Sequence, residues 1–429
     1  MIADKYRVLV VFVGFLCLVA TRSAFDYTPD EKKYIIWAVA AGTILGTFPI
    51  NYIYVKWHAR YPFFFSGMLS AAATAVLPFA AEYNYYLLLF VRFFQGVAFS
   101  ADFATVGVIT VRWAPLSELA IFLGALTCFT SFASVMTNGI SGAICTTFGW
   151  RYVFYIHAGI SVIVFTLWIL IYHDHPQMTS RVSATELRRI QKNKSEDHIQ
   201  AKAGKVPWKK LFTSPVVLCV WFNAFAEMSV IMFLHTYAPL FFNRILKFKV
   251  AETGYLVALS VFIPMPLKLV GGVISDKAKC FSEKAKMLFF NVISVGCCGL
   301  FVCVIGFVPQ ELNYVAVILF SVTFLCMAFN CAAFYKCATL HTRQYSHVVI
   351  AAIQWMKSIS LITGPALVAA VVRDEENAAQ WRIVLLILGG LNILATVFAF
   401  FIFTDKPAEW TESSTKPVVY EKKTEDVSL

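Results

Sequence analysis

The chain has 429 residues, of which 59% are hydrophobic and only 14% are charged, and its mean hydropathy is +0.69. A soluble globular protein averages about 25% charged residues, so the composition excludes an ordinary water-soluble domain and requires lipid around much of the chain. The net charge of +11 does not indicate nucleic-acid binding, because the basic residues lie in short segments between long apolar runs.

Twelve apolar runs follow one another along the chain, and each is long enough to cross a bilayer as a helix, which takes about 20 residues. The runs lie at 6–24, 33–55, 62–80, 85–111, 119–143, 150–172, 215–241, 250–274, 287–308, 313–340, 347–372 and 381–403. They predict an all-α membrane protein with twelve transmembrane helices. The first run, which follows Lys5 and Arg7, has the alternative of a signal peptide. Arg22 stands where cleavage would need a small residue and favours an uncleaved helix.

Lysine and arginine are distributed unevenly between the two sides of this predicted membrane protein. If both termini are cytoplasmic, 23 of the 36 Lys and Arg residues fall in cytoplasmic segments and 8 in external ones. This bias predicts cytoplasmic N- and C-termini. The largest share belongs to residues 173–213, where the stretch from Glu186 to Ile190 is expected to form a short surface helix.

The basic segment divides the chain into two similar halves. Residues 1–172 and 214–403 each contain six spans, 173–213 form a cytoplasmic linker, and 404–429 are expected to be a disordered cytoplasmic tail. The sequence that enters span six at Trp150 resembles the one that enters span twelve at Trp381. Two parallel six-helix repeats predict halves that rock about a central site, which is alternating access.

Four stretches carry a resemblance to a known family: residues 92–96 with 111–118, 149–155 with 173–176, 207–214, and 251–254 with 271–277. Through them the chain resembles the major facilitator superfamily and, more narrowly, its anion/cation symporter family, which includes vesicular glutamate transporters, sialin and type I sodium–phosphate cotransporters. The resemblance covers about residues 6 to 405. It implies a major facilitator fold and a secondary transporter of a small organic or inorganic anion, with proton or sodium coupling. It also implies a plasma-membrane or an endolysosomal or vesicular location.

The chain departs from the family pattern at Val55, Phe99, Cys337 and Leu340. Residues 49–56 lack the glycines and the acid of the family's first-half loop motif, whereas the second-half copy keeps its acid as Asp276. Phe99 stands where vesicular members carry the glutamate linked to proton coupling, so that route is missing. These departures favour an alternative function, a non-transporting sensor or receptor on a transporter scaffold.

Seven of the charged residues inside the predicted spans are candidates for a central polar site: Arg22, Arg92, Asp102, Glu227, Lys268, Lys336 and Lys357. An ionised group at the bilayer centre costs about 2.5–3.5 kcal/mol even on the lenient insertion scale. We therefore expect these side chains to face a polar cavity or to pair with one another. Because five are basic and two are acidic, the cavity is expected to attract anions.

The predicted substrate-binding residues are Arg22, Arg92, His235, Tyr237 and Lys336. Arg22 and Arg92 match arginines of the family, and a guanidinium binds carboxylate or phosphate with two parallel hydrogen bonds. Three alternatives stay open. Arg22 snorkels from a helix end, Arg92 pairs with Glu82 or another span, and His235 is a packing residue.

Two acids and one loop motif complete the predicted site. Asp102 and Glu227 are assigned to ion coupling or to fixed countercharge, and Glu227 lies where vesicular members carry a basic residue. Asp276 and Lys277 are assigned to gating, because a carboxylate at the end of span eight can accept a hydrogen bond from the N-terminus of a neighbouring span or pair with an arginine. The alternative for Asp276 is a solvated loop charge.

Enzymatic chemistry has no support in the sequence. Zinc-protease, nucleophile-elbow and nucleotide-binding motifs are missing, and the eleven cysteines contain no CxxC pair. We expect no enzyme activity, no cofactor and no metal site. The expected partners are a small anionic solute, a proton or sodium ion, and the lipid bilayer around a monomer.

Overall fold

The computed structural model describes residues 29–127, 144, 148–178, 182–192, 194, 206–248, 256, 260, 262, 264–278 and 280–411. These residues are almost entirely helical and contain no β-strand. The first predicted span, with Arg22, lies outside the described residues, as does most of the predicted tail.

The described helices of the N-terminal half follow the predicted apolar runs, and residues 128–143 of the predicted fifth span lie outside the described residues. These helices are α2 (Pro29–Trp57), α3 (Arg60–Tyr83), α4 (Tyr85–Phe99), α5 (Ala101–Trp113), α6 (Leu119–Thr127) and α8 (Trp150–Ile171). The predicted span 85–111 is confirmed as one apolar stretch, Tyr85–Trp113, with a single break in the helical pattern at Ser100. The Ser100 hydroxyl donates to the Val97 carbonyl oxygen at 2.7 Å, and such local hydrogen bonds compete with the helical pattern.

The described helices of the C-terminal half also follow the predicted runs, and most of the first part of the predicted eighth span, 250–263, lies outside the described residues. These helices are α12 (Pro215–Arg244), α14 (Pro264–Lys277), α15 (Glu283–Asn291), α16 (Cys298–Ile305), α17 (Asn313–Met327), α18 (Phe334–Thr342), α19 (Ser346–Val371) and α20 (Ala378–Ile402). Two predicted continuous spans are interrupted, by a π-helical turn at Val292–Cys297 and by a 3₁₀ segment at Ala328–Ala332. Interruptions of this kind are frequent at functional sites.

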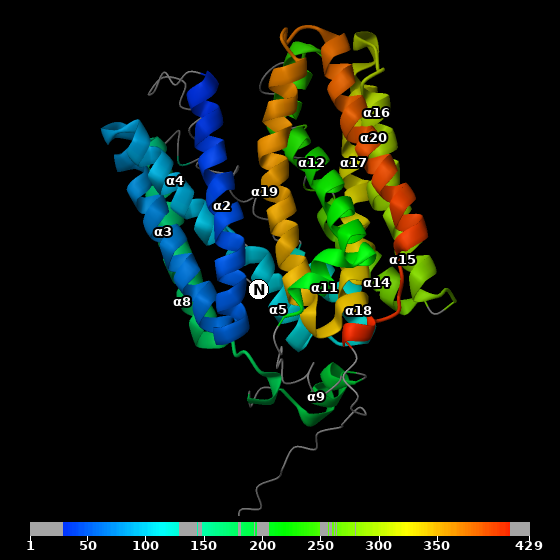
Figure 1. Cartoon of the computed structure of the whole chain (residues 1–429). Helices are drawn as coiled ribbons and strands as arrows, with labels where there is room; N and C mark the ends of the chain where they lie inside the picture. The colour runs from blue at the N-terminus through cyan, green and yellow to red at the C-terminus, as the bar shows by residue number, and fades with distance from the viewer. Residues whose placement is uncertain are drawn as a thin grey trace, which may run out of the picture.

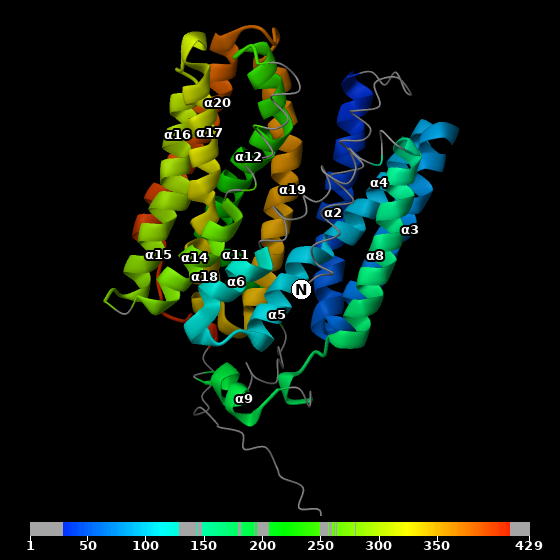
Figure 2. The same cartoon turned by 180° about the vertical axis from the view of Figure 1, so that it is seen from behind.

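Length and hydropathy identify eight helical segments in the described part of the chain as able to cross a membrane. Figures 1 and 2 show them as two bundles, with α2, α3, α4 and α8 in one and α12, α15, α16, α17 and α20 in the other. Helix α19 packs against α12 of its own half and against α2 and α5 of the other half. At the lower end of Figure 1, α6 packs against α14 and α18.

Aromatic packing joins the halves near that end. The rings of Phe103 on α5 and Tyr335 on α18 stack with centroids 6.4 Å apart, and both residues belong to one buried cluster that runs through both halves. The lower end is therefore closed in this conformation.

The linker carries the predicted surface helix as α9 (Ala184–Gln191), which is capped by the Ser183 hydroxyl. Leu187 and Ile190 are buried beside Trp113, and Arg189 pairs with Glu118. These contacts hold α9 against the N-terminal half. A second short helix, α11 (Trp208–Thr213), precedes α12.

Candidate functional site

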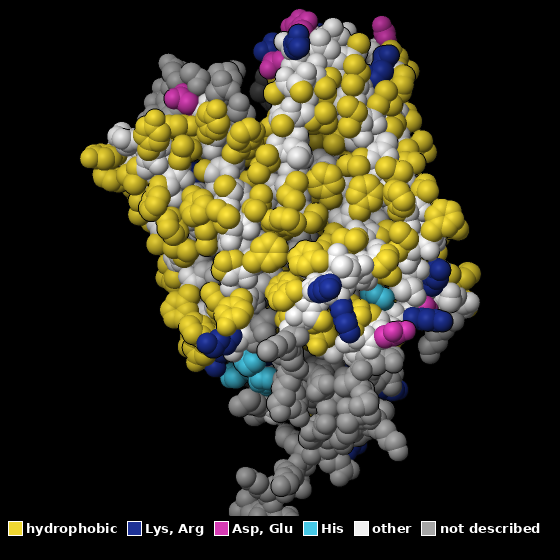
Figure 3. Space-filling view, in the orientation of Figure 1, with side chains coloured by type: hydrophobic (Ala, Val, Ile, Leu, Met, Phe, Trp, Pro, Cys, Tyr) yellow, Lys and Arg dark blue, Asp and Glu magenta, His cyan; other side chains and the backbone are white. Residues whose placement is uncertain are grey.

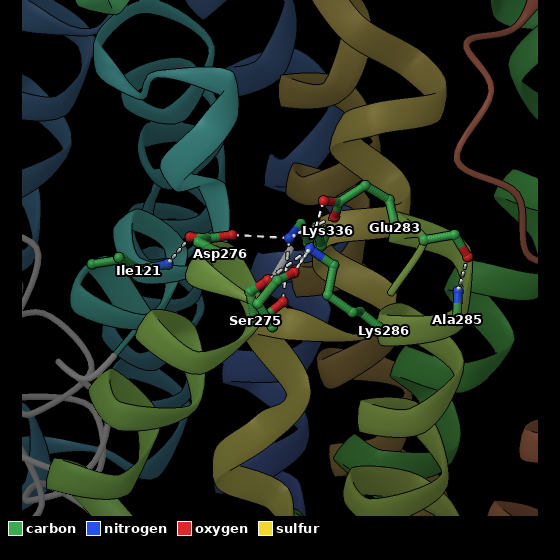
Figure 4. Close-up of polar contacts among 9 residues, drawn as sticks. Ile121, Ser275, Asp276, Glu283, Ala285, Lys286 and Lys336 are labelled. Carbon is green, nitrogen blue, oxygen red and sulfur yellow. Dashed lines mark hydrogen bonds and ion pairs between the residues drawn. The ribbon is translucent and has the colours of Figure 1, made fainter. Parts of the chain in front are cut away.

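A buried charge network lies where α14 ends (Figure 4). One oxygen of Asp276 is 2.9 Å from the Lys336 ammonium on α18. The other oxygen accepts a hydrogen bond at 2.9 Å from the backbone N–H of Ile121, in the first turn of α6. The two paired side chains are only 2–3% exposed. Because the start of a helix carries a partial positive charge, the Asp276 carboxylate is stabilised from both halves.

Glu283 and Lys286 on α15 complete this network. Lys336 lies 2.9 Å from a Glu283 oxygen, and Lys286 lies 2.6 Å from the other Glu283 oxygen. Lys286 also donates to the backbone carbonyl oxygen of Ser275 at 2.9 Å. Two lysines and two carboxylates thus balance in charge, which explains how Asp276, Lys286 and Lys336 remain buried beside the partly exposed Glu283. We call Ser275, Asp276, Glu283, Lys286 and Lys336 the Asp276 network.

Glycines bring the backbones of the two halves into contact around the network. A Cβ atom added to Gly272 on α14 would lie 2.8 Å from the carbonyl oxygen of Ala120 on α6. A Cβ added to Gly107 on α5 would lie 2.7 Å from the Cα of His347 on α19. Only the absence of these side chains permits such close helix packing.

A second buried cluster surrounds Glu227 on α12. This carboxyl group is completely buried, and one of its oxygens accepts a hydrogen bond at 3.0 Å from the Asn330 side chain in the 3₁₀ segment. The Lys268 ammonium on α14 acts on it electrostatically. Its second oxygen has no hydrogen-bond partner among the described residues, so part of its bonding capacity is unused.

A third cluster joins the halves through Lys357 on α19. Its ammonium lies 4.8 Å from the centre of the Phe99 ring on α4, which is a cation–π contact. Lys357 also interacts electrostatically with Asp102 on α5 and with His235 on α12. Phe99, one of the positions where the sequence departs from the family pattern, thus contacts a lysine of the other half.

Arg92 belongs to a chain of hydrogen bonds within the N-terminal half. It is 1% exposed and donates to the Gln95 side-chain oxygen at 3.2 Å, and Gln95 in turn donates to the Thr74 hydroxyl on α3 at 3.0 Å. Glu82, the alternative partner expected for Arg92, pairs with Arg151. The hydrogen bonds through Gln95 hold the Arg92 side chain against α3.

The other predicted residues are placed as follows. His235 contacts the Ile231 carbonyl oxygen at 2.8 Å and stacks edge-on against Phe324. Tyr237 packs against Trp381, with ring centroids 6.1 Å apart. Both residues have the contacts of packing residues. Lys277 is exposed.

Sequence reasoning misses several members of these clusters. It does not select Asn330, Glu283 or Lys286, and it gives Lys357 a charge but no role. Asn330 is detectable as an isolated amide in an apolar run. Glu283 and Lys286 lie among other loop charges, where nothing in the sequence separates a buried charge from a solvated one.

The family model described as Major Facilitator Superfamily matches residues 8–365. The chain belongs to the Major Facilitator Superfamily. This confirms the predicted fold and the predicted class of secondary transporters.

Three curated members of the superfamily show how distant the similarity is. The chain is 22% identical over 405 residues to vesicular glutamate transporter 1 of Xenopus laevis, covering 92% of this chain and 69% of the relative. It is 23% identical over 404 residues to sodium-dependent phosphate transport protein 1 of Mus musculus, covering 90% and 83%. It is 22% identical over 395 residues to sialin of Homo sapiens, covering 91% and 79%.

A solved superfamily structure shares the fold. The proton:xylose symporter XylE bound to 6-bromo-6-deoxy-D-glucose aligns with a TM-score of 0.68 and 15% identity, over 94% of each chain. These relatives carry the names of transporters and not of enzymes.

Proposed function

We propose that this member of the superfamily moves a small anion across a membrane by alternating access. The observation that carries the proposal is the hydrogen bond from Ile121 to Asp276, because it joins the two halves at a buried charge. The Asp276–Lys336 pair belongs entirely to the C-terminal half. When the halves separate, the carboxylate loses its bond to α6 but keeps its lysine, so no buried charge is left alone.

The Asp276 network therefore acts as a gate, and Lys336 is reassigned from substrate binding to this gate. Both of its carboxylate partners lie 2.9 Å away, so its charge is already neutralised in the closed state. We propose that the gate faces the cytoplasm, together with both termini and residues 173–213. Tags on each terminus, tested for antibody access before and after permeabilisation, check this topology. An external N-terminus contradicts it.

Anion binding is assigned to Arg92 and Lys357. The Lys357 ammonium lies 4.8 Å from the centre of the Phe99 ring, and an anion can replace this partner. The Arg92 guanidinium can bind a carboxylate or phosphate with two parallel hydrogen bonds. Two of the relatives are named for glutamate and phosphate. Arg22 keeps its predicted role in binding.

The test is uptake of labelled glutamate and of labelled phosphate into proteoliposomes. Wild type is expected to accumulate one of these anions. Arg92→Ala is expected to abolish uptake, and Arg92→Lys to impair it because the fork geometry is lost. Unchanged uptake by Arg92→Ala at equal protein incorporation rejects the assignment.

Coupling is assigned to Glu227, whose second oxygen is open to a further interaction. Protonation of Glu227 removes the negative charge that attracts Lys268. It thereby changes the relative stability of the inward-open and outward-open conformations. If Glu227 does not couple transport, movement of the anion is driven by the membrane potential alone.

A sensor on the transporter scaffold is the second candidate, favoured by the ring of Phe99 against Lys357. A sensor binds its anion without net flux. Calorimetric binding of glutamate or phosphate, together with no uptake in the same preparation, would establish this second function.

A further inference from the structure

Helix α11 lies across the seam between the two halves and presents an unusual mixture of side chains. Leu211 is 1% exposed and anchors the helix in the core, whereas Trp208 and Phe212 are 38% and 41% exposed. The Trp208 and Phe212 rings stack with centroids 6.2 Å apart. Lys209 and Lys210 are exposed beside them. Tryptophan and lysine side by side are typical of the membrane–water interface.

Helix α2 of the other half extends this aromatic surface. Phe48 is 39% exposed, and its ring centroid lies 6.3 Å from that of Trp208 and 5.7 Å from that of Trp355 on α19. A small pocket opens between the halves, lined by Phe48 and Asn51 from one side and by Trp208, Phe212 and Trp221 from the other. The site is therefore built by both halves.

Asn51 places a buried hydrogen-bond acceptor in this pocket. The residue is 3% exposed, and its side-chain oxygen has no hydrogen-bond partner among the described residues. It lies three residues after Phe48, which is about one helical turn closer to the end of α2. Asn51 therefore lies between Phe48 and the end of α2.

The charges beside the pocket are not neutralised. Lys209 and Lys210 form no ion pair among the described residues, in contrast to Lys286 and Lys336. Figure 3 shows dark blue side chains at the position of α11, immediately below a broad yellow surface that crosses the seam. Exposed cations next to lipid-facing aromatic rings attract anionic head groups.

We propose that an anionic phospholipid with a hydroxylated head group binds at this seam. Lys209 and Lys210 contact the phosphate, a head-group hydroxyl donates to Asn51, and an acyl chain lies along Phe48 and Trp208. Because the lipid touches α2 of the N-terminal half and α11, the linker helix that packs on α12 of the C-terminal half, it stabilises the conformation in which the gate end is closed. This inference does not rest on the identity of the transported anion.

Thermal unfolding of the purified full chain in detergent tests the proposal. Dioleoylphosphatidylglycerol is expected to raise the Tm, and dioleoylphosphatidylcholine at equal mole fraction is expected to raise it less. In the double variant Lys209→Gln/Lys210→Gln the half-maximal phosphatidylglycerol concentration is expected to rise about tenfold or more. Wild type is expected to respond at lower concentrations of phosphatidylglycerol than of dioleoylphosphatidic acid, which lacks the glycerol head group. Asn51→Leu is expected to remove this preference.

A matched double variant separates a built site from general surface charge. Lys284 and Lys406 are also exposed, and Lys284→Gln/Lys406→Gln removes the same charge while leaving the seam intact. It is expected to keep the wild-type response. An equal loss of response in both double variants overturns the proposal. So does an equal rise in Tm with inorganic phosphate, because that result assigns the lysines to a soluble anion.

Discussion

The Asp276–Lys336 pair and Glu227 are both buried, but they differ in how completely their charges are satisfied. In the network, each carboxylate has a lysine within 2.9 Å, and Asp276 also accepts a hydrogen bond from a helix N-terminus. Glu227 has one amide partner at 3.0 Å and an unpartnered second oxygen among the described residues. A balanced network suits a gate that holds one conformation, and an incompletely satisfied carboxyl group suits a proton carrier.

The largest expected effect comes from removing the lysine of the network. Lys336→Met leaves Asp276 buried without its cation, which typically costs about 3–5 kcal/mol. We expect a markedly lower Tm and poor membrane abundance. The second substitution in Lys336→Met/Asp276→Asn removes the stranded charge and is expected to recover much of the loss. A Tm equal to wild type in the single variant contradicts a balanced network.

The next expected effect tests whether the end of the molecule that holds the Asp276 network opens. Gly272→Ala places a methyl group 2.8 Å from the Ala120 carbonyl oxygen, so α6 and α14 must move apart. Cys331 is fully buried, and its sulfur would lie only 3.4 Å from a Cβ atom added to Gly124 on α6 at this seam, so it reports opening. We expect faster alkylation of Cys331, read by peptide mass spectrometry.

Gly159 on α8 provides the control for this experiment, because a Cβ atom there meets nothing within 4 Å. Gly159→Ala is expected to leave the alkylation rate of Cys331 unchanged. Equal rates in the two glycine variants would show that close packing of α6 and α14 does not hold the gate.

A smaller effect is expected at the contact between Phe99 of the N-terminal half and Lys357 of the C-terminal half. Phe99→Leu removes the cation–π contact with Lys357, which is worth about 0.5–2 kcal/mol. Because that contact competes with an anion for Lys357, we expect tighter substrate binding together with a slightly lower Tm. Weaker binding in Phe99→Leu would place the ring in the binding site itself.

The sequence predicted the helices well because a bilayer requires long apolar runs, and these runs are visible in the chain. It did not predict the breaks at Ser100 and at Ala328–Ala332, because neither break interrupts the apolar run in which it lies. It predicted a carboxylate that accepts from a neighbouring helix, and Asp276 has that hydrogen bond. The partner of Glu227 was missed, since Asn330 is 103 residues away and no local pattern links them.

The smallest expected effect concerns Lys194, a buried lysine that lies outside the membrane and, unlike Lys336, has no carboxylate partner among the described residues. Lys194 in the linker donates to the Val111 carbonyl oxygen at 3.0 Å, and burial lowers its pKa from 10.5 to about 7. The unfolded linker therefore holds its proton up to higher pH, and docking strengthens as pH rises from about 7 toward 10. Protection of the linker from subtilisin, corrected for protease activity, is expected to increase between pH 7 and pH 9.

Lys194→Met is expected to remove this increase, and Lys192→Met, at an exposed neighbouring position, is expected to retain it. The same pH response in wild type and Lys194→Met would mean that the buried amine does not control docking.

Anion uptake into proteoliposomes, with an imposed pH gradient and the membrane potential clamped at zero, tests the central difference between the two clusters most directly. The account predicts that wild type accumulates anion in response to the gradient. It further predicts that Glu227→Gln, which keeps the shape of the side chain but cannot carry a proton, retains exchange of anion without gradient-driven accumulation. Accumulation that survives in Glu227→Gln would contradict the assignment of Glu227 as the proton carrier.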